Sequence, residues 1–250
     1  MKLAIIGYGR MGHLIAEIAE ERGHKIVCTI DADNTDAFNS SEFRSADAAI
    51  EFSTPGTAVT NILACFAAKV PVVCGTTGWL DALPDLKDMC QKGDGTLLYG
   101  SNFSIGVNIF MAVNRYLAQV MNEFPEYKPT LIEIHHIHKL DHPSGTAITL
   151  AEDLVEEVTR IKGWDEPEPG KELAANVLPV DHVREGEVPG THIITWDSDV
   201  DKIVIEHEAK SRRGFAFGAV RAAEWIKGRK GFFTVADMLS DVTHTEGLFV

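Results

Sequence analysis

The sequence has few of the features that mark secreted or membrane-spanning proteins. Its four cysteines (Cys28, Cys65, Cys74 and Cys90) form no C-x-x-C pair, and three of them lie in apolar runs, which is typical of reduced, buried thiols. No apolar run approaches the ~20 residues of a membrane span. The first residues, MKLAIIGYGRMG, enter a strand and a glycine turn without a signal-type stretch. These absences predict a cytoplasmic chain.

Positive charge is also scarce. The chain has 23 Lys and Arg against 37 Asp and Glu, which gives a formal net charge of -14. Such a surface repels nucleic acid and anionic membranes on average, so neither is expected as a partner. An anionic ligand would need a local pocket of cations and N–H donors.

The first hundred residues alternate short apolar runs with helical patterns. Strands are expected at 3–7, 25–31, 48–53 and 70–75, and a helix is expected to begin near Pro55. This alternation with short connections is typical of a parallel α/β sheet.

Beyond residue 104 the pattern changes. A long apolar helix is expected at 105–122, strands at 130–136, 191–196 and 202–208, and an exposed loop at 164–172. We therefore predict a Rossmann-type, doubly wound parallel-sheet domain of α/β class. A second α+β domain with a mixed, open-faced sheet follows it.

A glycine turn lies between the first expected strand and the first expected helix. The stretch GYGRMG fits G-x-G-x-x-G, and Asp31 follows its last glycine by 19 residues at the end of the second strand. A carboxylate there can accept hydrogen bonds from the adenosine ribose of a dinucleotide. The candidate cofactor-binding residues are Gly7, Tyr8, Gly9, Arg10, Met11, Gly12 and Asp31.

The residue after Asp31 favours NADH over NADPH. It is Ala32, and the nearest basic residue in the turn is Arg10, so a 2′-phosphate would face a carboxylate with little compensation. Two further strand ends carry small residues that would let the backbone contact a nicotinamide. These additional cofactor candidates are Gly75, Thr76, Thr77, Gly100, Ser101, Asn102 and Phe103.

Residues 133–147 read EIHHIHKLDHPSGTA and contain four of the ten histidines. Spacing alone is compatible with a metal site, an acid/base site or a polar loop. Adjacent histidines on a strand point to opposite faces and no further Cys/His cluster completes a ligand set, so no metal is expected. Lys139 can pair with a carboxylate and donate a proton, whereas His138 and His142 are expected to have no role.

The turn that follows suits a carboxylate. Ser144, Gly145 and Thr146 offer two backbone amides and hydroxyl groups, which together form an anion-binding nest. This favours an acid site that binds anions.

Five motifs occur in an order that resembles the 4-hydroxy-tetrahydrodipicolinate reductase (dihydrodipicolinate reductase) family. They are GYGRMG, GTTG, SNFSIGVN, E-x-HH-x-H-K-x-D-x-PSGTA and SRRGFAFGAVRAA, and they span roughly residues 3–240. The resemblance implies NAD(P)H-dependent reduction of 4-hydroxy-tetrahydrodipicolinate to tetrahydrodipicolinate with loss of water, in lysine and diaminopimelate biosynthesis. It also implies catalysis by His135 with Lys139, and substrate binding by His136.

The same resemblance implies a domain plan and an assembly. Residues 1–104 and 218–250 would form the dinucleotide-binding domain, and 105–217 the substrate-binding and oligomerisation domain of a homotetramer. Many members have one more residue in the glycine turn and an Arg after the acidic residue; both differences favour NADH here. Arg212 and Arg213 could clamp an anion or serve a domain or subunit contact.

Two other functions remain compatible with the first domain. One is a Rossmann dehydrogenase of another amino-acid-type substrate, and the other is a non-catalytic NAD-sensing module. The basic, hydroxyl-rich loop at 135–146 argues against both, because a sensor has no need of a proton donor beside an anion nest.

Overall fold

Strands and helices alternate through the first hundred residues of the computed structural model, which describes residues 1–170, 172–245 and 247–249. Contacts divide the chain into two units. The first comprises Met1–Ile105 together with the segment that begins at Arg213, and the second comprises Gly106–Arg212. Each unit has its own sheet and its own buried core.

Six parallel strands form the sheet of the first unit, in the order β11-β5-β4-β3-β1-β2. Its elements are β1 (Lys2–Ile6), α1 (Arg10–Glu21), β2 (Lys25–Ile30), the 3₁₀ helix η1 (Thr35–Asn39), α2 (Ser41–Arg44), β3 (Ala48–Glu51), α3 (Pro55–Ala68), β4 (Val72–Cys74), the 3₁₀ helix η2 (Leu80–Ala82), α4 (Leu83–Lys92), β5 (Thr96–Tyr99), α7 (Arg213–Ile226), β11 (Gly231–Thr234) and α8 (Val235–Thr243).

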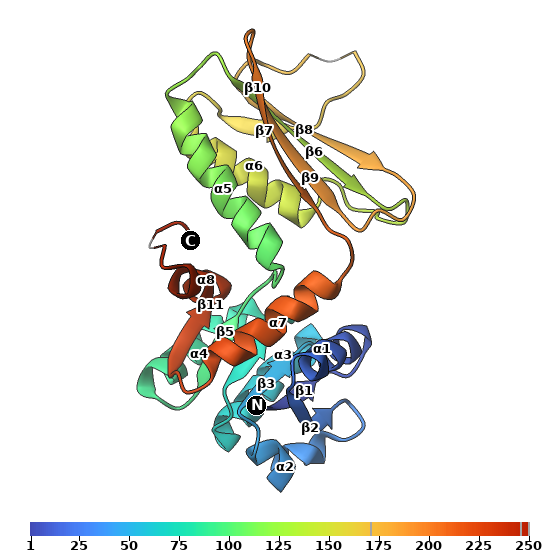
Figure 1. Ribbon diagram of the computed structural model, residues 1–250, viewed down its shortest axis with the longest axis vertical. Helices are drawn as coiled ribbons and strands as arrows, with labels where there is room; N and C mark the ends of the chain where they lie inside the picture. Colours follow the sequence, from blue (N-terminus) through green and yellow to red (C-terminus); the bar gives the residue numbers. More distant parts are fainter. Residues whose placement is uncertain (171, 246, 250) are drawn as a thin grey trace. The chain divides into compact units, whose positions relative to one another are not determined.

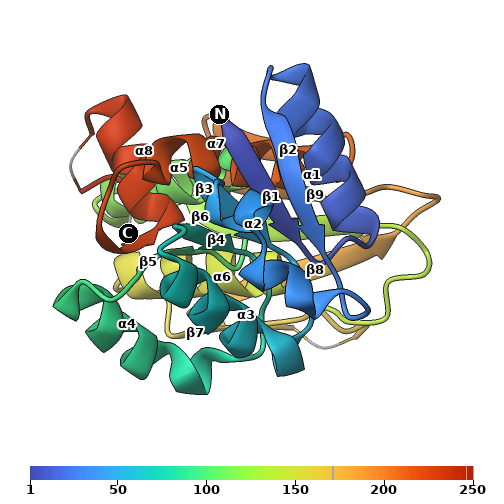
Figure 2. The same cartoon turned by 90° about the horizontal axis from the view of Figure 1, so that it is seen from below.

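Helices cover both faces of this sheet. Figure 2 shows α1 and α7 on one side and α3 and α4 on the other. The strands are therefore buried on both faces and consist of nearly continuous apolar residues, as in KLAII of β1. Strand order reverses at β1, because β2 lies on one side of it and β3 on the other. Ligands bind at such a reversal, beyond the carboxyl ends of the strands.

The second unit holds a mixed sheet of five strands in the order β10-β9-β6-β8-β7. Its elements are α5 (Ile105–Asn122), β6 (Lys128–His135), α6 (Gly145–Glu157), β7 (Gly163–Asp165), β8 (Val177–Arg184), β9 (Thr191–Asp197) and β10 (Lys202–Glu208). Strand β6 pairs antiparallel with β9 and parallel with β8.

In the part of the chain that the structure describes, helices cover one face of this second sheet. Helices α5 and α6 pack on it (Figure 1), and Leu131, Ile194 and Trp196 are fully buried there. The alternate residues, among them Ile132 and Ile193, point to the opposite face and are only half-buried. The predicted open-faced sheet follows directly from this alternation.

The predicted fold class is confirmed, with local corrections. Trp164 and Asp165, expected in an exposed loop, form part of β7, and residue 171 of that loop lies outside the described residues. The third strand ends at Glu51, because Phe52 and Ser53 already turn towards α3. The chain returns to the first unit at Arg213, where α7 begins, whereas the sequence predicted residue 218; this helix packs against α1 and beside β3 and β4.

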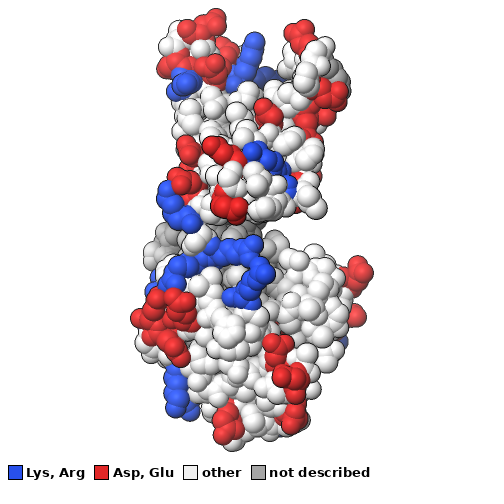
Figure 3. Space-filling view, turned by 90° about the vertical axis from the view of Figure 1, so that its right-hand side faces the viewer, with Lys and Arg blue, Asp and Glu red and all other residues white. Residues whose placement is uncertain are grey.

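The excess of acidic residues in the sequence is visible on the surface (Figure 3). On the face shown in Figure 3, acidic side chains form several separate groups, with basic side chains beside some of them. Among the described residues, none of the helices is both long and apolar enough to cross a bilayer.

Candidate active site

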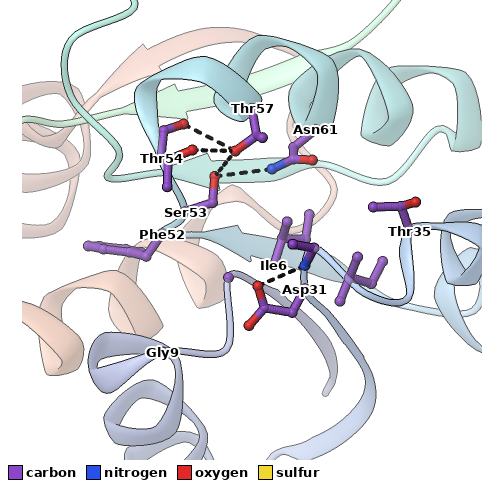
Figure 4. A pocket seen from close by; sticks show the side chains of 12 residues that line it. Ile6, Gly9, Asp31, Thr35, Phe52, Ser53, Thr54, Thr57 and Asn61 are labelled. Atoms are coloured by element: carbon purple, nitrogen blue, oxygen red, sulfur yellow. Dashed lines mark hydrogen bonds between the residues drawn. The ribbon is translucent and has the colours of Figure 1, made fainter.

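A pocket of about 260 Å³ lies at the carboxyl ends of β1, β2 and β3, where the strand order reverses (Figure 4). The residues that line it are Ile6, Gly7, Gly9, Ile30, Asp31, Ala32, Thr35, Phe52, Ser53, Thr54, Thr57 and Asn61. Of the candidate cofactor residues, Gly7, Gly9 and Asp31 belong to this lining.

The three glycines of the turn have different surroundings. A Cβ on Gly7, whose φ is +83°, would lie 2.1 Å from the Phe52 carbonyl oxygen, and one on Gly12 would lie 2.2 Å from the Gly7 oxygen. Beside Gly9 there is open space instead. Because α1 begins at Arg10 with no side-chain cap, amides of its first turn are available to an anion. This arrangement fits the pyrophosphate of a dinucleotide.

Asp31 is held in place by backbone amides. Its Oδ1 accepts from the Ala32 N–H at 2.8 Å and its Oδ2 from the Tyr8 N–H at 3.2 Å. The carboxylate is thus fixed beside the glycine turn at the end of β2, where it can accept hydrogen bonds from a ribose. Arg10, at the start of α1, is exposed, and Met11 is half-buried.

The opposite wall of the pocket was not identified from the sequence. It follows β3 and consists of Phe52, Ser53 and Thr54, with Thr57 and Asn61 from the first turns of α3. The available signal was a buried strand that runs into a hydroxyl-rich turn, with Pro55 as the first residue of a helix.

The remaining cofactor candidates lie at the ends of the next strands of the sheet. Thr76 Oγ1 accepts from the Ser53 N–H at 2.8 Å, and a Cβ on Gly75 would lie 2.2 Å from the Phe52 ring. The buried Phe103 ring lies 5.7 Å from the Phe52 ring. The other members follow β4 or β5 with different exposures: Thr77 and Ser101 are exposed, Asn102 is half-buried and Gly100 is buried. Gly75, Thr76 and Phe103 thus contact residues of the pocket wall, and none of the seven candidates is among the residues that line the pocket.

In the second unit, the histidine loop starts from a buried carboxylate. Glu133 on β6 is fully buried, and its Oε2 accepts from the Ser144 N–H at 3.1 Å while its Oε1 accepts from Arg184 Nη2 at 3.0 Å. His135 Nδ1 lies 3.2 Å from Glu133 Oε2. One carboxylate therefore joins the end of β6, the start of α6 and β8.

Burial alone would oppose ionisation of Glu133. The contacts from His135, Ser144 and Arg184 outweigh that effect and hold the pKa of its carboxyl far below its usual range. A neighbouring imidazole behaves differently, because burial, followed by repulsion from His135, lowers the pKa of His192 to about 4. His192 is consequently neutral near pH 7, and its Nε2 lies 3.1 Å from Ser144 Oγ.

The residues predicted to bind a carboxylate, Ser144, Gly145 and Thr146, lie at the start of α6. Ser144 caps the helix, and its Oγ accepts from the Ala147 N–H at 3.2 Å. The amides of Gly145 and Thr146 lie between Ser144 and Ala147 in the chain, in the part of a helix where backbone donors have no intrahelical acceptor. The helix dipole adds to their attraction for an anion.

Lys139 faces an acidic partner in this structure. Its Nζ lies 2.6 Å from Asp141 Oδ2, and this hydrogen bond holds the pKa of Asp141 below its ordinary value. Arg184 fixes the same loop through the carbonyl oxygens of Lys139, at 3.2 Å, and Asp141, at 2.8 Å. His136, predicted to bind substrate, is half-buried at the end of β6.

Two clusters of the described residues could offer ligand atoms to a metal ion: Glu133, His135 and His192, and His142, Glu166 and His182. In the first, the carboxylate already accepts from a backbone amide and a guanidinium. In the second, the two imidazoles are stacked, 3.9 Å apart and 18° from parallel. The Nδ1 atoms of His142 and His182 each lie 2.7 Å from Glu166 Oε2, so both rings already meet at one carboxylate oxygen.

Family models match the chain over nearly all of its length. The dihydrodipicolinate reductase N-terminus model matches residues 1–103, and the dihydrodipicolinate reductase C-terminus model matches residues 106–239. The chain belongs to the dihydrodipicolinate reductase family. It is therefore an oxidoreductase, and the family implies a pyridine nucleotide cofactor.

Relatives of known name support this membership. A 4-hydroxy-tetrahydrodipicolinate reductase from Christiangramia forsetii is 47% identical over 97% of this chain and 99% of its own length. One from Archaeoglobus fulgidus is 33% identical over 96% of this chain and 100% of its own. A dipicolinate-bound dihydrodipicolinate reductase from Paenisporosarcina sp. TG-14 shares the fold, with a TM-score of 0.76 and 19% identity over 94% of this chain and 97% of that one.

We predict that His192 makes stability depend on pH. Its pKa of about 4 in the folded state lies below the value of about 6.5 for an unfolded histidine. The unfolded chain then takes up a proton that the folded chain does not, so stability falls as pH decreases from 6.5 towards 4, by about 3 kcal/mol at most. Urea unfolding at pH 7 and pH 4.5 should show a smaller loss for His192→Gln than for the wild type. The exposed variant His138→Gln should behave as the wild type; an equal loss in all three proteins would contradict the assignment.

Proposed function

We propose that this chain reduces 4-hydroxy-tetrahydrodipicolinate to tetrahydrodipicolinate, with loss of water, in lysine and diaminopimelate biosynthesis. Relatives named for this activity match it over nearly their full lengths. The observation that carries the proposal is the loop after β6, where an imidazole, an ammonium and an open helix N-terminus follow one another within residues 135–146. A dicarboxylate with an imine-type nitrogen needs both anion donors and a proton donor.

The first turn of α6 would hold the substrate. The amides of Gly145 and Thr146 and the Thr146 hydroxyl can donate to one carboxylate, and His136 can contact the substrate from the end of β6. Support comes from the dipicolinate-bound neighbour, whose named ligand is a small dicarboxylate. Ser144 would act chiefly by capping α6 and fixing this turn.

His135 and Lys139 would supply the proton. The ionised Glu133 lies 3.2 Å from His135 Nδ1 and can orient this ring, while Lys139 can exchange its pairing with Asp141 for a substrate carboxylate. A bound dihydronicotinamide supplies the hydride. The residues of the loop then have to hold the substrate, deliver one proton and permit water to leave.

NADH is the cofactor we propose, held by Gly7, Gly9 and the first turn of α1. The Asp31 carboxylate keeps its place through two backbone amides and would accept from the ribose hydroxyls. Ala32 supplies no cation for a 2′-phosphate, which would meet this carboxylate directly.

We further propose a cytoplasmic homotetramer assembled through the second sheet. The face opposite α5 and α6 exposes apolar side chains, and Val204 on the edge strand β10 is 46% exposed. A second copy of this sheet would bury them. A cytoplasmic location is consistent with the family's place in amino-acid biosynthesis and with the free thiols.

A coupled assay tests the proposed function. The purified chain is mixed with aspartate semialdehyde, pyruvate, the upstream synthase and NADH, and the absorbance of the reduced cofactor is followed. Oxidation of NADH that requires the synthase is expected. If NADH is consumed equally without the synthase, or not at all, the chain does not carry out this reaction.

We predict that binding and chemistry separate within the histidine loop. His135→Gln or Lys139→Met should lower kcat by roughly 10²-fold, the usual range for loss of a general acid, with NADH affinity unchanged. Substitution of Lys139 should raise KM as well, since one ammonium would hold the substrate and give the proton. His136→Gln and Thr146→Val should act mainly on substrate KM. His138→Gln is the matched control, and a wild-type kcat in His135→Gln would overturn these roles.

The cofactor preference gives a separate prediction. The kcat/KM for NADH should exceed that for NADPH, because Asp31 repels a 2′-phosphate. Ala32→Arg adds the missing guanidinium and should improve kcat/KM for NADPH by about tenfold, equivalent to ~1.4 kcal/mol. A tenfold preference of the wild type for NADPH would show that another cation, such as Arg10, compensates.

A further inference from the structure

Glu51, the last residue of β3, is a fully buried carboxylate beneath the cofactor pocket. Neutral groups surround it: the Ser53 hydroxyl donates to Oε1, Asn61 Nδ2 lies 3.3 Å from Oε1, and the Cys74 thiol lies 3.0 Å from Oε2. In the described part of the chain no lysine, arginine or histidine forms an ion pair with it. A buried carboxylate satisfied only by neutral donors must orient those donors.

The thiol behaves as a donor. Burial first, and then the charge of Glu51, raise the pKa of Cys74, so the sulfur keeps its proton and directs it at Oε2. Oε2 of Glu51 therefore accepts from the thiol, and Oε1 accepts from the Ser53 hydroxyl and the Asn61 amide.

This fixes the hydroxyl of Ser53. A serine has one hydrogen, and that hydrogen points at Glu51. Ser53 Oγ can then only accept from its other two neighbours, Asn61 Nδ2 at 3.1 Å and Thr57 Oγ1 at 3.0 Å. This determines which atom donates in the contact between Ser53 and Thr57.

The two threonines complete the wall. Because the single Ser53 hydrogen points at Glu51, the 3.0 Å contact between the hydroxyls of Ser53 and Thr57 is a hydrogen bond with Thr57 as its donor. The 2.9 Å contact between the hydroxyls of Thr54 and Thr57 then requires Thr54 to donate. Figure 4 shows these bonds in a row along one wall of the pocket, which therefore presents oxygen lone pairs.

The position of this wall indicates which part of a dinucleotide it meets. If Gly7 and Gly9 adjoin the pyrophosphate and Asp31 the adenosine ribose, the rest of the same pocket receives the base. Adenine offers an exocyclic amino group with two hydrogens, whereas hypoxanthine offers a carbonyl oxygen at the same position. An oxygen wall matches the amino group and repels the carbonyl oxygen.

We propose that Glu51 is a positioning residue that sets the hydrogen-bonding polarity of this wall, so that the pocket selects a 6-aminopurine over a 6-oxopurine. The inference rests on the cofactor site of the proposed function and extends it to recognition of the base. Glu51 does not itself line the pocket; it acts through Ser53 and Thr57.

The test compares the dissociation constants of NADH and of its hypoxanthine analogue, measured by fluorescence titration without substrate. The wild type should bind NADH about tenfold more tightly than the analogue, because the carbonyl oxygen of hypoxanthine would face the oxygen acceptors of the wall and find no donor there. In Glu51→Gln the new amide can donate to Ser53 Oγ and release the hydroxyl hydrogens towards the pocket. The ratio of the two constants should fall towards one.

The ratio distinguishes wall polarity from simple loss of structure. Glu224→Gln is the matched control in the same unit, since Glu224 pairs with Arg22 at 2.8 Å and His24 at 2.7 Å and is not part of the pocket lining; its ratio should be that of the wild type. Equal weakening of both ligands in Glu51→Gln, or no discrimination by the wild type, would overturn the proposal. If Glu51→Gln does not fold, Ser53→Ala breaks the same link, and an unchanged ratio in that variant overturns it equally.

The outcome is separable from that of the reduction assay. Base discrimination with no turnover of 4-hydroxy-tetrahydrodipicolinate would contradict the proposed reaction and support this inference. Failure of the wild type to bind either dinucleotide would contradict the cofactor site and this inference together.

Discussion

The geometry of the second unit depends on one buried carboxylate. Glu133 has no exposed surface, so its charge must be met within the protein, and the groups that meet it come from three separate segments. Ser144 caps α6, the helix whose first turn would bind an anion. Arg184 also binds the carbonyl oxygens of Lys139 and Asp141, and His135 is the proposed acid. Loss of this charge would leave the half-buried Arg184 guanidinium without its carboxylate and residues 136–146 without their anchor.

The first unit also contains a fully buried carboxylate, with different partners. Glu51 also stands near the carboxyl end of a strand, but it is satisfied by a thiol, a hydroxyl and an amide in place of a guanidinium. A strand end is a suitable place for such a residue, because the ladder stops there and loops with free hydroxyls and amides begin. In both units an acidic residue behind the site orients the groups that would touch a ligand.

Sequence patterns predicted the architecture and the motifs well, and long-range partners poorly. The alternating strands, the glycine turn and helix 105–122 were all evident from local periodicity, which the fold retains. Arg184 lies 51 residues from Glu133 and His192 lies 48 residues from Ser144, and no local pattern connects such pairs. Glu51 resembled an ordinary polar residue in an apolar strand, because its burial depends on strands that pair with β3 on both sides.

The proposed site requires Glu133 to order residues 136–146. The direct measurement is amide hydrogen exchange, by mass spectrometry, of Glu133→Gln against the wild type and against Glu156→Gln, an exposed carboxylate on α6. Residues 136–146 should exchange at least about tenfold faster in Glu133→Gln only, since ~1.4 kcal/mol of lost local stability raises exchange tenfold. The first unit should exchange as in the wild type. Wild-type protection of residues 136–146 in folded Glu133→Gln would contradict the account.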